Sequence, residues 1–133
     1  MTTRLLIGVI AFGAGFILAP KELPTKEVIV AERIEVPVVY EMTLTDLPLA
    51  WQELAKCESN GRLNAVSGTK KQFQGAFQIE YPRTWVAHGG DSDTPPKKAT
   101  LKEQFHVALH IYADRGAKPW PYCGKFLKEE YGR

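Results

Sequence analysis

The chain has 133 residues, of which 44% are apolar and 24% are charged, and its formal net charge is +2. This composition is typical of one small globular domain with appended segments. The weak charge, without any block of basic residues interleaved with aromatics, gives no sign of a nucleic-acid-binding surface, so we expect no nucleic-acid partner.

The N-terminus carries a short apolar segment. Arg4 precedes an uncharged run at residues 5–19, a layout typical of a signal sequence. The run is shorter than the roughly 20 apolar residues that usually span a bilayer. The cleavage signal is poor, because Ile17 is not small and Pro20 would follow the cut, so we favour an uncleaved membrane anchor at 1–20 over a cleaved signal peptide. A basic residue retained inside would direct the rest of the chain out of the cytoplasm. The domain is then anchored outside the cytoplasm, or secreted if the segment is removed.

Residues 21–45 predict an extended stalk. They contain prolines, alternating charges and many β-branched residues, and no helical period is sustained over them. We therefore divide the chain into an anchor at 1–20, a stalk at 21–45 and a folded domain at 46–133.

A helix is predicted at the start of the domain. Asp46 is a plausible N-cap, Pro48 falls in the first turn, and the helix should end before Gly61. Its apolar face recurs at steps of three and four and ends in a glutamate. The residues of this face are Leu47, Trp51, Leu54, Ala55 and Glu58.

Further along the chain, a short second helix is predicted over 81–90 and a third helix from Thr100 to Gly116. Thr100 and Glu103 form a capping box, and Gly116 is a typical C-terminal stop. Between the first two helices, 67–78 predicts a loop or a small hairpin. The fold class is therefore mainly α (α+β), a small helical domain with a short β element. The apolar stripe predicted for the third helix is Leu101, Phe105, Ala108, Leu109 and Tyr112.

Glu58 is the candidate acid. A carboxylate near a helix C-terminus meets the negative end of the helix dipole, and burial against Trp51 would further disfavour its charge. Both effects raise a pKa, and a carboxylic acid that stays protonated near neutral pH is what glycosidic bond cleavage requires. Taken alone, a glutamate at a helix end is more often a solvated surface residue.

Two further pairs of residues could form a disulfide or a metal site. Cys57 and Cys123 both lie in the exported part, where two thiols of one small domain usually pair, although two free buried cysteines are the alternative. His106 and His110 have the i, i+4 spacing of a zinc pair but lack an identified third ligand. We therefore expect no metal site and no cofactor.

The domain resembles a known family on five motifs in order. They are Trp51-x-x-Leu54-Ala55-x-Cys57-Glu58-Ser59, Gly75-x-Phe77-Gln78, Thr84-Trp85 with His88-Gly89-Gly90, Ala99-Thr100 with Glu103-Gln104, and Pro119-Trp120-Pro121 with Cys123. In this order and near this spacing, they resemble the catalytic domain of the resuscitation-promoting factors. These are lysozyme-like muralytic proteins related to lytic transglycosylases.

The resemblance implies roles for individual residues. Glu58 matches the catalytic glutamate of the family, and Cys57 and Cys123 match its disulfide pair. Two residues, Gln78 and Thr84, fall where the family lines its saccharide cleft. Three aromatic residues are further candidates for substrate contact, with the domain core as the alternative for the tryptophans: Phe77, Trp85 and Trp120.

The implied function is cleavage of the β-1,4 bond between N-acetylmuramic acid and N-acetylglucosamine in the glycan strands of peptidoglycan. No second carboxylate sits in a matching motif, so a single-glutamate acid/base mechanism is expected, as a hydrolase or as an anhydro-forming transglycosylase. Three other carboxylates are available, Glu80, Asp91 and Asp93, and we interpret each as a solvated loop residue.

Two alternatives stay open. One is a non-catalytic peptidoglycan-binding module, and the other is a membrane-tethered structural module on the same fold. A wall peptidase is a conceivable protein partner that the sequence does not identify. Departures from the family at Arg62 and at residues 68–74 affect fine specificity.

Overall fold

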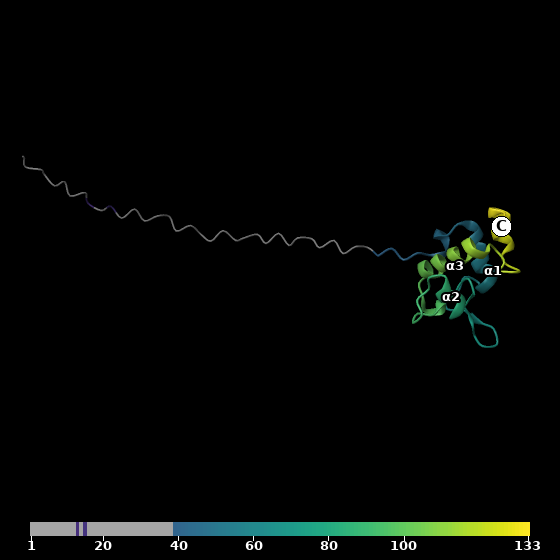
Figure 1. Ribbon diagram of the computed structural model, residues 1–133. Helices are drawn as coiled ribbons and strands as arrows, with labels where there is room; N and C mark the ends of the chain where they lie inside the picture. Colours follow the sequence, from purple (N-terminus) through teal and green to yellow (C-terminus); the bar gives the residue numbers. More distant parts are fainter. Residues whose placement is uncertain (1–12, 14, 16–38) are drawn as a thin grey trace, which may run out of the picture. The chain divides into compact units, whose positions relative to one another are not determined.

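The computed structural model describes residues 13, 15 and 39–133 of the chain. Apart from residues 13 and 15, the predicted anchor at 1–20 lies outside these residues, and so does most of the predicted stalk at 21–45. Within the part that is described, no helix is both long enough and apolar enough to cross a membrane. Val38–Arg133 forms a compact unit of its own (Figure 1).

The last residues of the predicted stalk belong to this unit. A 3-10 helix, η1, spans Leu44–Asp46, and the side chains of Met42 and Leu44 contact the hydrophobic core. The packed domain therefore includes several residues before position 46.

Helix α1 spans Leu49–Ser59, and the prediction that Asp46 caps it is wrong. The carboxylate of Asp46 instead accepts hydrogen bonds from the backbone N–H and the hydroxyl of Thr43, both at 2.7 Å. The cause is Pro48, because a residue that precedes proline is disfavoured in the helical region. Leu47 is accordingly extended, with ψ 153, and helical geometry begins only after the proline.

The predicted apolar face of α1 is buried, and Trp51 lies at its centre with 2% of its surface exposed. The Trp51 ring meets four other aromatic rings edge-on, with centroid separations of 5.4 to 5.8 Å. Such T-shaped pairs add to the free energy of burial. Trp51 thereby connects α1 to the hairpin region, to α3 and to the C-terminal loop. Its four partners are Phe77, Phe105, Tyr112 and Trp120.

The predicted β element is confirmed as a small antiparallel sheet in the order β1-β2-β3. The strands are Val66–Ser67, Phe73–Gln74 and Ile79–Glu80. Ser67 pairs with Phe73, and Phe73 pairs with Glu80. Because cross-strand partners point to the same face of a sheet, these side chains form one row. The turn between β1 and β2 projects away from the body of the domain (Figure 1).

Three helical elements complete the middle of the domain: α2 (Arg83–Ala87), the 3-10 helix η2 (Pro96–Lys98) and α3 (Leu101–Arg115). The capping box of α3 and its termination at Gly116 are confirmed. Leu109 is 39% exposed, so its place in the predicted stripe is wrong. The helix is turned so that a polar residue with internal partners, Gln104, faces the core. The buried residues of α3 are Leu101, Gln104, Val107, Ala108 and Ile111.

A last helix, α4 (Lys125–Tyr131), was not predicted. It packs against α1 and buries Leu127 completely. Gly124 precedes α4 at a point where the backbone passes close to Trp120. A Cβ at Gly124 would lie 2.4 Å from the carbonyl oxygen of Trp120. Only glycine lacks that atom.

Candidate active site

Glu58 lies in the last turn of α1, one residue before the helix ends. Asn60 follows in the left-handed conformation, with φ 57, and Gly61 continues the turn with φ +73. Both residue types tolerate this region of backbone space, which is why the helix stops here. Because the helix stops here, the half-buried Glu58 side chain lies at the C-terminal end of α1.

A groove runs past Glu58, formed by two adjoining cavities of about 350 and 180 Å³. Glu58 lines the first cavity and Glu80 lines the second. The two cavities share four wall residues and therefore adjoin, and together we call them the Glu58 groove. The shared residues are Phe73, Gln78, Pro119 and Trp120.

Burial raises the pKa of Glu58 above the usual range of a glutamate. Removal from water disfavours the charged form of a carboxyl group. Within residues 39–133 no hydrogen bond or ion pair of the structure involves this carboxyl group, so nothing there offsets the effect. The negative end of the α1 dipole acts in the same direction. The Glu58 carboxyl group is therefore suited to stay protonated where it lines the groove.

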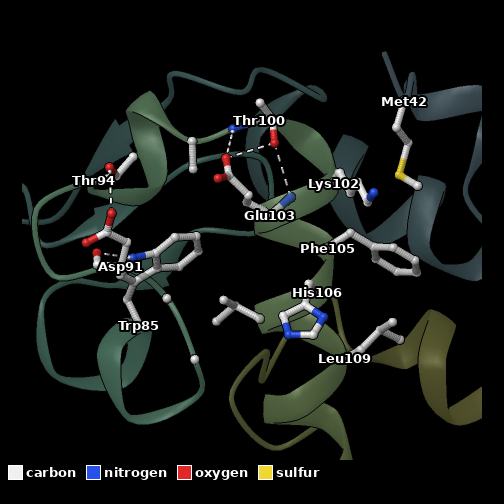
Figure 2. Close-up of a pocket in the computed structure, with 14 residues that line it drawn as sticks. Met42, Trp85, Asp91, Thr94, Thr100, Lys102, Glu103, Phe105, His106 and Leu109 are labelled. Atoms are coloured by element: carbon white, nitrogen blue, oxygen red, sulfur yellow. Dashed lines mark hydrogen bonds between the residues drawn. The ribbon is translucent and has the colours of Figure 1, made fainter. Parts of the chain in front are cut away.

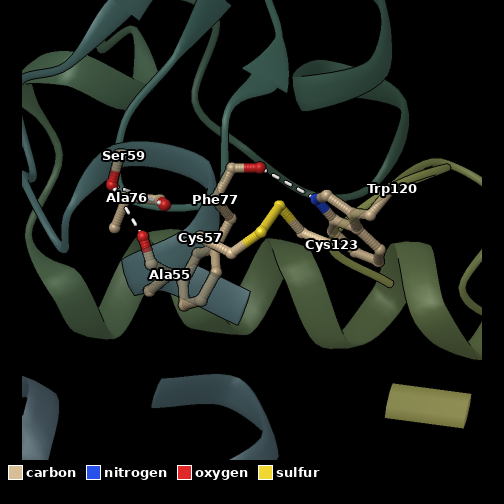
Figure 3. The surroundings of a disulfide bond; sticks show 7 residues. All are labelled: Ala55, Cys57, Ser59, Ala76, Phe77, Trp120 and Cys123. Atoms are coloured by element: carbon tan, nitrogen blue, oxygen red, sulfur yellow. Dashed lines mark hydrogen bonds between the residues drawn. A yellow bond between two sulfur atoms is a disulfide. The ribbon is translucent and has the colours of Figure 1, made fainter. Parts of the chain in front are cut away.

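Two links hold the end of α1 to other segments of the domain, and a third joins those two segments to each other (Figure 3). The hydroxyl of Ser59 lies 2.8 Å from the carbonyl oxygen of Ala76, to which it donates. The indole N–H of Trp120 donates to the carbonyl oxygen of Phe77 at 2.8 Å. The disulfide between Cys57 and Cys123 joins the turn beside Glu58 to the C-terminal loop. The acid is thus fixed relative to both walls.

Gln78 is held in a single orientation inside the groove. Its backbone is in the left-handed region, with φ 50. Its side-chain amide donates to the carbonyl oxygen of Gly75 at 2.9 Å, and its amide oxygen accepts from the hydroxyl of Ser67 at 2.5 Å. One amide hydrogen and one oxygen lone pair remain for a ligand.

Three of the five residues predicted to bind substrate line the Glu58 groove: Gln78, Thr84 and Trp120. The structure does not bring Phe77 and Trp85 into it. Phe77 has no exposed surface, because its ring packs against Trp51 at 5.8 Å.

The Trp85 side chain faces a different part of the domain. It is 1% exposed, and its indole N–H donates to the carbonyl oxygen of Asp91 at 2.9 Å. It contributes to the wall of a separate cavity of about 610 Å³, together with Met42 and Phe105 (Figure 2). Its packing makes it a core residue.

His106 also lines this second cavity, and its ring centroid lies 4.4 Å from that of His110. Among the residues that the structure describes, no group of three or more histidine, cysteine or acidic side chains is arranged to hold a metal ion.

Several groove residues were not predicted from the sequence to bind substrate: Phe73, Glu80, Arg115, Pro119 and Tyr122. The row of Ser67, Phe73 and Glu80 on one face of the sheet supplies part of the wall. Its signal in the sequence is weak, because each strand has two residues and cannot display an alternating pattern.

The disulfide predicted from the cysteines is confirmed, with its Cα atoms 5.7 Å apart and a sequence separation of 66 residues. Closing a loop of this size stabilises a domain by about 4 kcal/mol in the chain-entropy model. Replacing Cys57 and Cys123 together by serine should lower the melting temperature by about 15 °C or more. Calorimetry of the double variant against the oxidised wild type measures this. A melting temperature within a few degrees of wild type would show that the crosslink contributes little.

A helix ending in a half-buried glutamate that faces a small antiparallel sheet across a groove defines a lysozyme-like domain. The chain belongs to the transglycosylase-like domain family, whose model matches residues 46–123. This range contains Glu58, the disulfide and the shared walls of the groove.

The resemblance to the resuscitation-promoting factors is also confirmed. The chain is 38% identical over 74 residues to resuscitation-promoting factor RpfC of Mycobacterium tuberculosis, covering 56% of this chain and 49% of that protein. It is 35% identical over 74 residues to Rpf2 of Corynebacterium glutamicum, covering 55% of this chain and 19% of that protein. Rpf1 of the same organism is 36% identical over 78 residues, covering 58% and 39%. The chain thus spans about half or less of the length of these relatives.

Proposed function

We propose that the domain cleaves the β-1,4 glycosidic bond between N-acetylmuramic acid and N-acetylglucosamine in peptidoglycan. The observation that carries this proposal is Glu58, a half-buried carboxyl group with a raised pKa that lines an open groove. A proton donor must keep its proton near the working pH and reach the leaving oxygen. Family membership and the likeness to resuscitation-promoting factors support the same activity.

In this mechanism Glu58 acts first as the acid. Its carboxyl group gives a proton to the glycosidic oxygen as the bond from that oxygen to C1 breaks, and positive charge develops on the ring. The acetamido group of the same sugar can stabilise C1 from within the substrate. The Glu58 carboxylate then takes a proton from the group that attacks C1. Attack by water leaves a reducing end, whereas attack by the muramyl 6-hydroxyl leaves a 1,6-anhydro end and consumes no water.

We also infer that the domain acts outside the cytoplasm. Disulfides persist in oxidising compartments, and the Cys57–Cys123 bond lies beside the acid. An anchor formed by residues 5–19 would keep the groove close to the wall, and it stays a prediction from the sequence.

The test is a product analysis with the full 133-residue chain in its oxidised form. Purified peptidoglycan is incubated with the protein, and the released fragments are identified by mass spectrometry. We expect soluble muropeptides cut between N-acetylmuramic acid and N-acetylglucosamine, and the chemistry of the new end separates hydrolysis from anhydro formation. Fragments with cut peptides and intact glycan would overturn the proposal. Binding to the wall without any release would favour a non-catalytic wall-binding module instead.

A further inference from the structure

Glu80 lines the Glu58 groove, although its sequence context suggested a solvated loop residue. It is the second residue of β3, and its partner across the sheet is Phe73, which lines both cavities. The Glu80 side chain is 30% exposed. A ligand that follows the shared walls away from Glu58 therefore meets a second carboxyl group.

Two neighbours hold the Glu80 carboxylate. The hydroxyl of Thr84 donates to its Oε2 at 2.6 Å, and a guanidinium nitrogen of Arg83 lies 3.2 Å from its Oε1. Arg83 is 84% exposed, so its contact is screened by water and is weak. Thr84 is thus the main residue that orients the carboxylate. A carboxylate offers about four acceptor positions, so room remains for donors from a ligand.

The hydrogen bond from Thr84 to Glu80 limits how Thr84 can contact a ligand. Its single hydroxyl proton is already donated to Glu80, so it is not free to donate to a sugar. The group that can accept a hydrogen bond from a ligand here is the Glu80 carboxylate, which the Thr84 hydroxyl holds in place. Sugar hydroxyls and acetamido N–H groups are donors, and they bond more strongly to an ionised acceptor than to a neutral one.

We propose that Glu80 binds the glycan through its ionised carboxylate and that Thr84 is a positioning residue for it. This inference rests on the proposed function, because it takes a glycan as the ligand of the groove. The chain then uses two carboxyl groups in opposite protonation states along one groove, Glu58 as proton donor and Glu80 as hydrogen-bond acceptor.

The charges that face Glu80 favour this state. The hydrogen bond from Thr84 lowers the pKa of Glu80 most, and the positive charges of Arg83 on α2 and Arg115 on α3 act in the same direction, while partial burial opposes them. The neighbouring strand β2 contributes only Phe73 and Gln74, which carry no charge. Glu80 therefore stays ionised to a lower pH than an isolated glutamate.

The test measures binding separately from cleavage. All variants carry Glu58→Gln, which prevents turnover and removes the titration of that residue. The probe is tetra-N-acetylchitotetraose, titrated by calorimetry near neutral pH. Adding Glu80→Gln should weaken binding by about ten-fold or more, as expected when a charge-assisted hydrogen bond is lost. The matched control is Glu53→Gln, which should leave the affinity unchanged, because Glu53 is a partly exposed glutamate paired with Lys56 on α1.

A second series tests Thr84 through pH. With Thr84 intact, affinity should persist at neutral pH and fall as the pH drops through the lowered pKa of Glu80. Thr84→Val removes the hydroxyl that lowers this pKa, so the loss should begin at a higher pH. A purely structural role for Thr84 would weaken the fold without moving this midpoint.

The outcomes separate this inference from the proposed function. Unchanged affinity in the Glu80→Gln variant would overturn the inference, and so would a parent protein that does not bind the probe. A larger loss from Thr84→Val than from Glu80→Gln at neutral pH would also overturn it, because Thr84 would then contact the glycan itself. If binding depends on Glu80 while the wild type releases no muropeptides, the inference holds and the proposed cleavage fails.

Discussion

Glu58→Gln should lower the rate of glycan cleavage by about 10²- to 10⁴-fold, which is the usual contribution of a general acid and base. An amide of the same shape cannot give up a proton to the leaving oxygen. The domain should keep its fold, because burial already disfavours the charged form of Glu58, and a neutral side chain suits that position. Release of muropeptides from peptidoglycan measures the rate, and the melting temperature measures the fold.

The matched control for this prediction lies on the same helix. Glu53 is partly exposed on α1 and forms an ion pair with Lys56 at 2.9 Å, away from the residues that line the groove. Glu53→Gln should retain the wild-type rate. A Glu58→Gln variant that still cleaves at this rate would assign the acid to another group. A marked fall in its melting temperature would instead make the loss of activity a folding defect.

The parts of the domain that the sequence predicts well are those set by local chemistry. Thr100 and Glu103 cap α3, and Gly116 ends it, because each contact lies within a few residues along the chain. The apolar period of α1 likewise places Glu58 at the end of a buried face. The error at Asp46 is local too, since Pro48 keeps the preceding residue out of the helix.

The opposite wall of the groove is less predictable, because residues far apart in the chain build it. Phe73 and Glu80 meet across strands of two residues each, which are too short for a period to emerge. Trp85 and Trp120 both occur in family motifs, and only packing separates them. Trp85 donates its N–H to the backbone of Asp91 and lines another cavity, while Trp120 lines the groove.

Gln104 is the one polar residue among the buried residues of α3, and the apolar pattern of the helix does not reveal its position. Its side chain has no exposed surface. The amide oxygen accepts from the backbone N–H of Ala76 at 2.7 Å, and the amide nitrogen donates to the carbonyl oxygens of Leu63 and Ala99 at 3.1 and 3.0 Å. Gly75 makes room for it, because a Cβ there would lie 2.2 Å from the Gln104 oxygen.

Gln104→Leu should therefore destabilise the domain strongly although the two side chains are similar in size. It leaves the N–H of Ala76 and the carbonyl groups of Leu63 and Ala99 without their partner, and each buried group left unpaired costs about 1–3 kcal/mol. We expect a loss of about 5 kcal/mol in the free energy of unfolding and a fall of about 20 °C or more in melting temperature. Urea and thermal unfolding of the oxidised protein measure both quantities.

Gln52→Leu is the matched control, because Gln52 donates a single, partly buried hydrogen bond to Leu47 at 2.8 Å. Its expected cost is about 1 kcal/mol. Equal losses in the two variants would contradict a special role for Gln104.

The predicted difference also bears on activity, since Gln104 fixes Ala76, which accepts a hydrogen bond from Ser59 beside Glu58. Below its melting temperature, Gln104→Leu should thus cleave more slowly than Gln52→Leu, because the acid and the opposite groove wall are no longer held together by the same backbone contacts.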